Sequence, residues 1–376
     1  MSSTTTVKRK LDIGGVLIEG RAFIALIAII IIFSLLSDSY LTMSNFVSMT
    51  KHVAMNAILA IGMLTVILNA GIDLSVGSTM GMSGMIAGWL LQGVHIDTLG
   101  VVLYPQLWLV ILISCGVGAL IGWVNGMIIT RLHVTPFVAT LGMMYVVRGL
   151  AMLVTNGTTF PNLKGSPGLG NEGFWLIGGP GFFDIPMAIW IMVVLSIIVY
   201  FVVRKTQFGR WLYASGGNER AAELSGVPVR KVSVRVYMIA GFCAAVAGLI
   251  AASELTSAAP QTGVGFELNA IAAVVIGGAS LFGGRGTVRG ALVGAFVIGF
   301  LSDGLVIVGV STFWQQVVMG GVIVVAVAVD QAQQGVKKTK SLAIVSASTK
   351  TPDAKSETQL ADTRSSGPSD SVDADR

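Results

Sequence analysis

Ten apolar runs, separated by short polar or glycine-rich segments, constrain this chain more than any other feature. Most of them approach the roughly 20 residues that a helix needs to cross a bilayer. Only 11% of the 376 residues are charged, against about 25% in soluble domains. The pattern predicts an all-α, polytopic membrane protein with about ten transmembrane helices. The runs lie near residues 22–36, 53–69, 78–93, 106–130, 135–154, 186–203, 235–255, 266–283, 290–310 and 313–330.

Lysine and arginine are distributed unevenly between the two ends of these runs. With the N-terminus inside, the inner flanks carry seventeen Lys and Arg residues and the outer flanks carry only Lys51 and Lys164. Cytoplasmic loops of membrane proteins are enriched in these two residue types. The bias therefore predicts an even number of spans, with the N- and C-termini both cytoplasmic.

Polar segments flank the apolar part of the chain. Residues 1–20 are predicted to form a cytoplasmic N-terminal arm, and no small-residue cleavage site follows the first run, which favours a retained span over a signal peptide. The membrane domain is predicted over residues 21–335. Residues 336–376 are rich in Ser, Thr, Asp and Ala, which predicts a disordered cytoplasmic tail.

Two segments interrupt the apolar runs with residues that break helices. They are 69–78, NAGIDLSVGS, and 277–286, GGASLFGGRG. Irregular backbone at membrane depth needs protein or water to satisfy its polar groups, so both are expected in the interior or at its inner mouth. An offset of 213 residues aligns Asn56 with Asn269 and three later glycines with glycines. This indicates a weak parallel repeat, and chance matching in a glycine- and alanine-rich chain is the alternative.

Glycines recur four residues apart within several runs. At this spacing they share one helix face and allow two backbones to approach closely. The abundance of glycine, with 47 residues, is the alternative explanation. The sets are Gly77/Gly81, Gly84/Gly88, Gly118/Gly122/Gly126 and Gly290/Gly294.

Three charged residues lie in or beside apolar runs. A carboxylate at the centre of a membrane helix costs roughly 2.5–3.5 kcal/mol on insertion scales, so Asp73 either caps the helix that starts near Ser75 or lines a pathway. Arg148 has two interpretations. Its side chain either reaches the outer membrane surface or a structural partner, or it faces a transport pathway. A contact between Arg148 and Asp303 is one hypothesis for its partner.

The segment 209–231, GRWLYASGGNERAAELSGVPVRK, is polar and basic between two apolar runs. Asn218 is a favourable helix N-cap, and Gly226 followed by Pro228 ends the helix. We expect about two turns of helix at the cytoplasmic surface. So short a helix is unstable alone, so it is either braced by its neighbours or docked on another protein.

Several kinds of chemistry are absent from the sequence. It contains no GxxxxGK[ST] phosphate loop, no nucleophile–His–acid set and no metal-ligand spacing among its three histidines. Cys115 and Cys243 lie inside apolar runs and are interpreted as small hydrophobic residues. The chain is predicted to be no enzyme and to bind no metal, cofactor or nucleic acid. Energy for transport would then arrive from a cytoplasmic partner.

Four stretches, in matching order and spacing, carry a resemblance to a known family. The sequence resembles the membrane-spanning permeases of bacterial ATP-binding-cassette importers for monosaccharides, of the ribose, xylose, arabinose and galactoside type. The stretches are MNAILAIGMLTVILNAGIDLSVGS (55–78), GWVNGMIITRLHVTPFVATLGMMYVVRGLAMLVTNG (122–157), FGRWLYASGGNERAAELSGV (208–227) and FELNAIAAVVIGGASLFGGRGTVRGALVGA (266–295).

This resemblance implies a set of partners in the bacterial inner membrane. It implies a homodimer of permeases surrounded by lipid, a cytoplasmic ATP-binding-cassette protein that uses ATP and Mg²⁺, and a periplasmic sugar-binding protein. It also implies that residues 218–226 form the coupling helix, which sits in a cleft of the ATPase. The implied contact residues are Asn218, Glu219, Arg220, Ala221, Ala222, Glu223 and Gly226.

Polar residues on the spans are candidates for the substrate pathway, because sugars are bound by amide, hydroxyl and aromatic groups. No motif separates pentose from hexose, and relatives in the family also carry nucleosides or other small polar solutes. The candidates are Asn56, Asn69, Asp73, Ser75, Asn125, Thr140, Arg148 and Asn269.

Two other classes of protein remain as alternatives. An ion- or proton-coupled secondary transporter would act without an ATPase, and the lack of visible buried acid pairs argues against it. A membrane anchor or enzyme without transport activity would need a catalytic set, and the sequence shows none.

Overall fold

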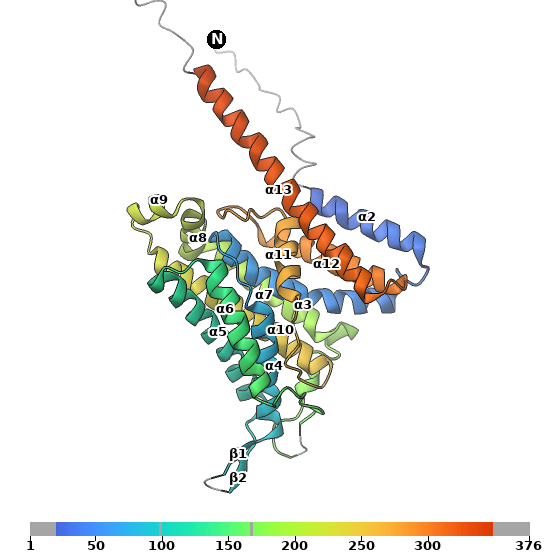
Figure 1. Cartoon of the computed structure of the whole chain (residues 1–376). Coiled ribbons are helices and arrows are strands. Elements are labelled where there is room, and N and C mark those ends of the chain that lie inside the picture. Colours follow the sequence, from blue (N-terminus) through green and yellow to red (C-terminus); the bar gives the residue numbers. More distant parts are fainter. Residues whose placement is uncertain (1–19, 98–99, 166–167, 349–376) are drawn as a thin grey trace, which may run out of the picture. The chain divides into compact units, whose positions relative to one another are not determined.

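The computed structural model describes residues 20–97, 100–165 and 168–348. Helices make up most of these residues (Figure 1). The α-helices are α2 (Arg21–Leu36), α3 (Met43–Leu68), α4 (Val76–Gln92), α5 (Leu107–Leu132), α6 (Pro136–Leu153), α7 (Met187–Lys205), α8 (Gln207–Gly217), α9 (Glu219–Leu224), α10 (Val229–Glu254), α11 (Phe266–Ile276), α12 (Val288–Ile307) and α13 (Thr312–Ser348).

Seven of these helices are long and apolar enough to cross a membrane: α3, α5, α6, α7, α10, α12 and the first part of α13. The other three expected spans correspond to shorter helices, α2 with 16 residues, α4 with 17 and α11 with 11. The structure therefore confirms a polytopic helical membrane protein. The count of ten spans and the cytoplasmic termini stay predictions.

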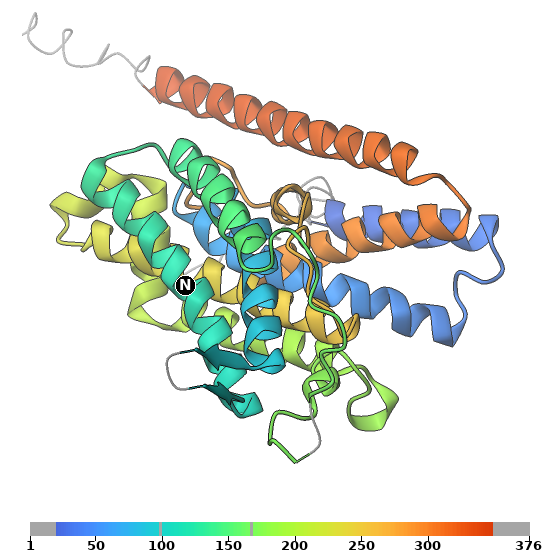
Figure 2. The same cartoon turned by 60° about the horizontal axis from the view of Figure 1, so that its bottom comes forward.

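A short β-hairpin departs from the all-α expectation. Strand β1 (Val94–Ile96) pairs antiparallel with β2 (Val101–Leu103) between α4 and α5. Figures 1 and 2 show it as two teal arrows, and in Figure 1 it lies at the end of the helices away from α8 and α9. Such β-branched, alternating segments favour strands.

Helices α3 and α10 form the interior of the unit Met1–Val327. About 78% of the apolar window of α3 and 83% of that of α10 is buried, against 28% for α5 and α7. Both central helices are rich in alanine and glycine, which allow close packing. Helix α12 packs beside α2, where Tyr40 Oη donates to the carbonyl oxygen of Phe300 at 3.1 Å (Figures 1 and 2).

The spaced glycines of α5 lie at a helix–helix contact, as predicted, whereas Gly81 and Gly88 face loop residues. A Cβ atom at Gly118 would overlap the carbonyl oxygen of Gly241, and one at Gly122 would overlap that of Tyr237, so α5 and α10 meet through their backbones. We call this contact, which also includes Gly126 beside Val234, the α5–α10 seam. The other three sets also face neighbouring backbone or side chains, with Gly84 the loosest.

Both predicted breaks are present. Helix α3 ends at Leu68 and α4 begins at Val76, while α11 ends at Ile276 and α12 begins at Val288. The apolar run expected at 266–283 is thus helical only to Ile276, because Gly278, Gly283 and Gly284 adopt positive φ angles that end a helix. Each half has a helix, an irregular segment and a helix, and the internal repeat remains a prediction.

The end of the chain forms a second unit, Ala328–Arg376. The backbone of α13 is helical through Ser348, whereas disorder was predicted from residue 336. The rest of the predicted tail, residues 349–376, and residues 1–19 of the predicted N-terminal arm lie outside the described residues.

Candidate functional site

Helix α9, the predicted coupling helix, is a capped helix of six residues between α8 and α10. The Oδ1 atom of Asn218 accepts a hydrogen bond from the Ala221 amide at 3.0 Å, which satisfies one of the free donors at the helix start. Glu219 in the first turn complements the helix dipole. The helix ends at Leu224, and Gly226 takes the left-handed conformation with φ of 82°. The cap and stop predicted from the sequence are confirmed.

The surface of α9 is divided between a buried and an exposed face. Ala222 is only 4% exposed, and it packs toward the chain's own helices. Ala221 and Glu223 are exposed, and the side chain of Leu224 is 81% exposed (Figure 1 shows the position of α9). Single exposed apolar side chains are normal on protein surfaces, so Leu224 is accessible for docking without by itself identifying an interface.

Helix α8 connects α9 to the first break. Ser215 Oγ donates to Asn69 Oδ1 at 3.1 Å, and Asn69 Nδ2 donates to Ser233 Oγ of α10 at 2.9 Å. Gly216 lies directly against the carbonyl oxygen of Leu68, where a Cβ atom would overlap it. The end of α3 is therefore held by α8 through both side chains and backbone.

The second break reaches the same place. The Gly284 amide donates to the carbonyl oxygen of Leu68 at 3.0 Å, and Tyr213 Oη of α8 donates to the carbonyl oxygen of Gly286 at 2.8 Å. Burial raises the pKa of Tyr213, with Arg204 opposing the effect, which favours the protonated hydroxyl that donates. We call these contacts of α8 with the two breaks the α8 junction.

Four of the predicted pathway residues meet at the first break. Asp73 Oδ1 accepts from the amide of Ser75 at 2.8 Å and from its hydroxyl at 2.6 Å. Asn125 Nδ2 of α5 donates to Ser75 Oγ at 2.8 Å, and Thr140 Oγ1 of α6 accepts from the Leu74 amide at 3.2 Å. Asp73 thus fixes Ser75, the residue before α4, without bonding to the free amides of the helix itself, and both the capping and the pathway interpretation stay predictions.

This group, which we call the break cluster (Asp73, Ser75, Asn125, Thr140), is enclosed in the observed conformation. Its members are at most 1% exposed. Asn125 Oδ1 and the hydroxyl of Tyr237 are buried without a hydrogen-bond partner among the described residues. Buried polar atoms without partners are costly, so a water or solute bound beside these two atoms would be stabilised.

The remaining predicted pathway residues lie elsewhere. Arg148 Nη1 donates to the carbonyl oxygens of Pro260 and, at 2.9 Å, Thr262, so its partner is backbone. The hypothesis of an Arg148–Asp303 contact was wrong, because Asp303 Oδ1 lies 3.3 Å from His52 Nδ1.

Asn56 and Asn269 are half-buried, and Asn56 Oδ1 has no hydrogen-bond partner among the described residues. A role of any of these residues in a pathway stays a prediction.

The structure also reveals features that sequence reasoning missed. Lys51 Nζ lies 2.9 Å from Glu254 Oε1, and His52 lies within ion-pair distance of both Glu254 and Asp303. Nothing in the sequence links these positions, which are up to 252 residues apart. The α8 junction was missed because its side-chain bonds join residues far apart in the sequence and its other contacts are made by backbone groups. Across the described residues, no group of three His, Cys, Asp or Glu side chains is placed to hold a metal ion.

Comparison with known proteins places the chain among the membrane permeases of transport systems. The chain belongs to the family described as "Branched-chain amino acid transport system / permease component", whose sequence profile matches residues 45–327. The resemblance to permeases of ATP-binding-cassette importers is thereby confirmed.

Individual relatives match almost the whole chain. The ribose import permease RbsC of Bacillus subtilis is 42% identical over 328 residues, which cover 87% of this chain and 97% of the relative. RbsC of Escherichia coli K12 is 39% identical over 89% of this chain and 100% of its own. The L-arabinose ABC transporter permease AraH of Azospirillum brasilense is 34% identical over 82% and 86%. No solved structure gives a significant match.

Proposed function

We propose that this permease translocates a monosaccharide across the bacterial inner membrane, driven by a separate ATPase and supplied by a periplasmic sugar-binding protein. The observation that carries the proposal is the near full-length match to permeases named for ribose and arabinose. A match of this extent includes the loops and helix ends as well as the apolar spans. ATP and Mg²⁺ are assigned to the partner ATPase, and the permease is proposed to work as a homodimer.

The geometry supports a route by which work enters the permease. Helix α9 presents Ala221 and Leu224 outward, as a docking surface for the ATPase would require. Its neighbour α8 is bonded to both breaks through Ser215 and Tyr213. A displacement of α9 would therefore reach the end of α3 and the segment that precedes α12 together.

The nature of the solute is the finer part of the proposal. The family description names branched-chain amino acids, whereas the relatives with the longest matches are named for sugars. We favour a monosaccharide, and a nucleoside or another small polar solute is the alternative. Soluble receptors set the specificity of such importers, so the solute follows from the receptor that docks on the outer face.

A stand-alone secondary transporter is the remaining candidate from another class. The cluster of Lys51, His52, Glu254 and Asp303 supplies ionisable groups that such a mechanism needs. Its charges, however, are paired with opposite charges, as in a structural network.

Reconstitution decides among these proposals. The permease is placed in liposomes with the ATPase and the secreted receptor encoded beside it, and uptake of labelled ribose, arabinose, galactose, adenosine and leucine is measured. Uptake of a sugar that requires both receptor and Mg-ATP is expected. Uptake driven by a proton gradient without the ATPase would refute the proposal of ATP-driven transport. Uptake of leucine or adenosine, but of no sugar, would refute the proposal that the solute is a monosaccharide.

A further inference from the structure

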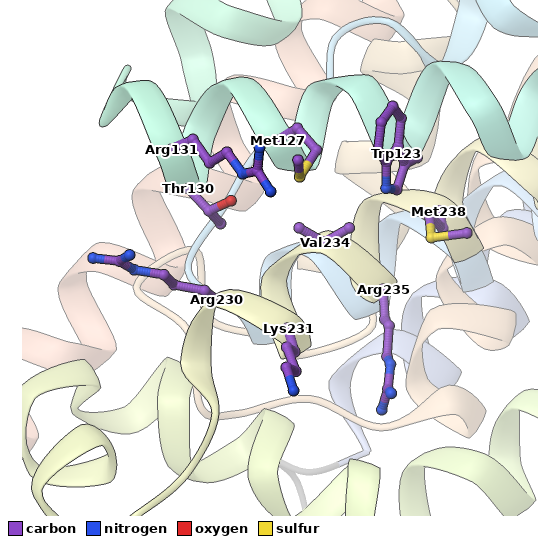
Figure 3. A pocket seen from close by; sticks show the side chains of 9 residues that line it. All are labelled: Trp123, Met127, Thr130, Arg131, Arg230, Lys231, Val234, Arg235 and Met238. Carbon is purple, nitrogen blue, oxygen red and sulfur yellow. The ribbon is translucent and has the colours of Figure 1, made fainter.

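A basic pocket lies between the ends of α5 and α10 that are predicted to face the cytoplasm, next to the α5–α10 seam. It has a volume of about 550 Å³ (Figure 3). Four cationic side chains line it, together with apolar and hydroxyl groups. The lining residues are Trp123, Met127, Thr130, Arg131, Arg230, Lys231, Val234, Arg235 and Met238.

The four cations lack partners of opposite charge, as most cations in the described residues do, and they are distinguished by lining one pocket. In the described part of the chain, no carboxylate lies within ion-pair distance of Arg131, Arg230, Lys231 or Arg235. All four are exposed. Figure 3 shows Arg131 extending from α5 toward α10, whereas Lys231 and Arg235 extend from α10 away from α5, so these long side chains would have to turn to meet one anion. Four like charges around one pocket repel each other, so an anion bound there would be stabilised.

A second, apolar pocket of about 300 Å³ continues the first one toward the membrane interior. The two share Met238, and the apolar pocket is lined by residues of α3, α5, α7 and α10. Its lining residues are Thr65, Ala119, Leu195, Ile198, Val199, Val202, Met238, Ile239, Phe242 and Cys243.

Residue spacing places the two pockets along the same faces of α5 and α10, and we call the pair the groove. On α5, Ala119, Trp123, Met127 and Arg131 recur every four residues and so share one face. On α10, the lining residues run from Lys231 to Cys243. Twelve residues of helix span about 18 Å, and half the hydrocarbon thickness of a bilayer is about 15 Å. The groove therefore has the length of one lipid leaflet, with a cationic end and an apolar end.

We propose that this groove binds an anionic phospholipid of the cytoplasmic leaflet. The headgroup phosphate would lie against Arg131, Lys231 and Arg235, and an acyl chain would follow Trp123 and Met238 into the apolar pocket. Basic pockets between helices on the cytoplasmic side bind such headgroups in other membrane proteins. Helix α10 begins just after α9, the predicted coupling helix. A lipid in the groove would therefore stabilise the position of the helix that follows α9 directly in the chain. The proposal does not depend on the transported solute.

Tryptophan fluorescence tests the proposal directly, because Trp123 lines the groove. The full-length permease is reconstituted in phosphatidylcholine vesicles that contain dibrominated phosphatidylglycerol or dibrominated phosphatidylcholine, since bromine quenches nearby tryptophan. The quenching that disappears in Trp123→Phe is assigned to Trp123. Phosphatidylglycerol is expected to bind about fivefold more strongly than phosphatidylcholine at this site, the factor that one headgroup–cation interaction gives.

Charge variants supply the matched comparison. The triple variant Arg131→Gln, Lys231→Gln, Arg235→Gln is expected to lose the preference for phosphatidylglycerol. The control Arg204→Gln, Lys205→Gln, Arg210→Gln removes three exposed cations outside the groove and is expected to keep it. Thermal unfolding of each variant checks that the protein is folded. If the triple variant is unfolded, Met238→Trp in the Trp123→Phe background repeats the quenching measurement with all cations present.

Four results would overturn the proposal. Equal quenching of the wild type by both lipids would show that the groove does not prefer an anionic lipid. An unchanged preference in the folded triple variant would show that the three cations do not bind the headgroup. Quenching by neither lipid would mean that protein, such as a second copy, covers the groove. Displacement of phosphatidylglycerol by inorganic phosphate, but not by chloride of the same ionic strength, would mean that the pocket binds free phosphate instead.

Discussion

The cap of helix α9 offers the sharpest test of how this permease receives work. Asn218→Ala removes the Oδ1 atom that accepts from the Ala221 amide at 3.0 Å. Asn218 is exposed and this is its side chain's only bond among the described residues, so the change removes the cap and little else. Losing an N-cap costs about 1 kcal/mol, which is about a fivefold change in an equilibrium constant.

A six-residue helix has little stability to spare, because helix formation is cooperative. If the ATPase binds α9 only as a helix, its affinity for Asn218→Ala falls by up to about fivefold, the limit reached when the uncapped helix is mostly unformed. Asn218→Asp keeps an acceptor and adds a negative charge at the helix start, so it should match the wild type. The affinity is measured by titrating the ATPase onto reconstituted permease, alongside ATP-dependent uptake.

Gln207→Ala, at an exposed position at the start of the neighbouring α8, serves as the control. Wild-type affinity in Asn218→Ala would show that the order of α9 does not limit docking. An Asn218→Asp variant as weak as Asn218→Ala would show that the loss has another cause than the cap. Either result would refute the reasoning.

Three further predictions concern the docking face, the seam and the junction. Leu224→Glu should leave the fold intact, since this side chain is 81% exposed, yet weaken ATPase binding about tenfold or more, as an interface anchor does; unchanged binding would exclude Leu224 from the interface. Gly122→Ala should lower the stability in thermal unfolding by about 1–3 kcal/mol, because its Cβ would overlap the carbonyl oxygen of Tyr237, whereas Gly149→Ala, with no atom within 4 Å, should be neutral or stabilising. Equal losses in the two glycine variants would contradict the seam. Tyr213→Phe removes the hydrogen bond to Gly286, which contributes about 1 kcal/mol to stability. If work passes from α9 through α8 to the breaks, this variant should hydrolyse more ATP for each sugar transported. An unchanged ratio of ATP to sugar would rule out transmission through α8.

Local chemistry made parts of this structure predictable from the sequence. The cap at Asn218 and the left-handed Gly226 follow from short-range rules of helix ends, and both are present. The four-residue glycine spacing of α5 predicted a close contact, although not that α10 would be the partner. The breaks near Asp73 and Gly284 were predictable because glycines and polar residues interrupt apolar runs that are otherwise uniform.

Long-range pairing was beyond the sequence. A contact between Asp303 and Arg148 was one hypothesis from the sequence, but the tertiary fold places His52 beside Asp303. The two alanines of α9 are equivalent in the sequence, yet only Ala222 is buried, because α9 packs on its neighbours with one face. The α8 junction combines backbone groups, which every residue carries, with side-chain bonds of Ser215 and Tyr213 to residues far away in the sequence, so no local pattern marks it.

The carbonyl oxygen of Leu68 is where three distant parts of the chain touch, because Gly216 lies against it and the Gly284 amide bonds to it. Such a place tolerates change only when all three parts change together. Chimaeras built to exchange ATPase partners should therefore transplant residues 207–224 along with the loop 277–286. Moving α9 alone would combine it with an α8 junction from another protein, whose contacts would not match.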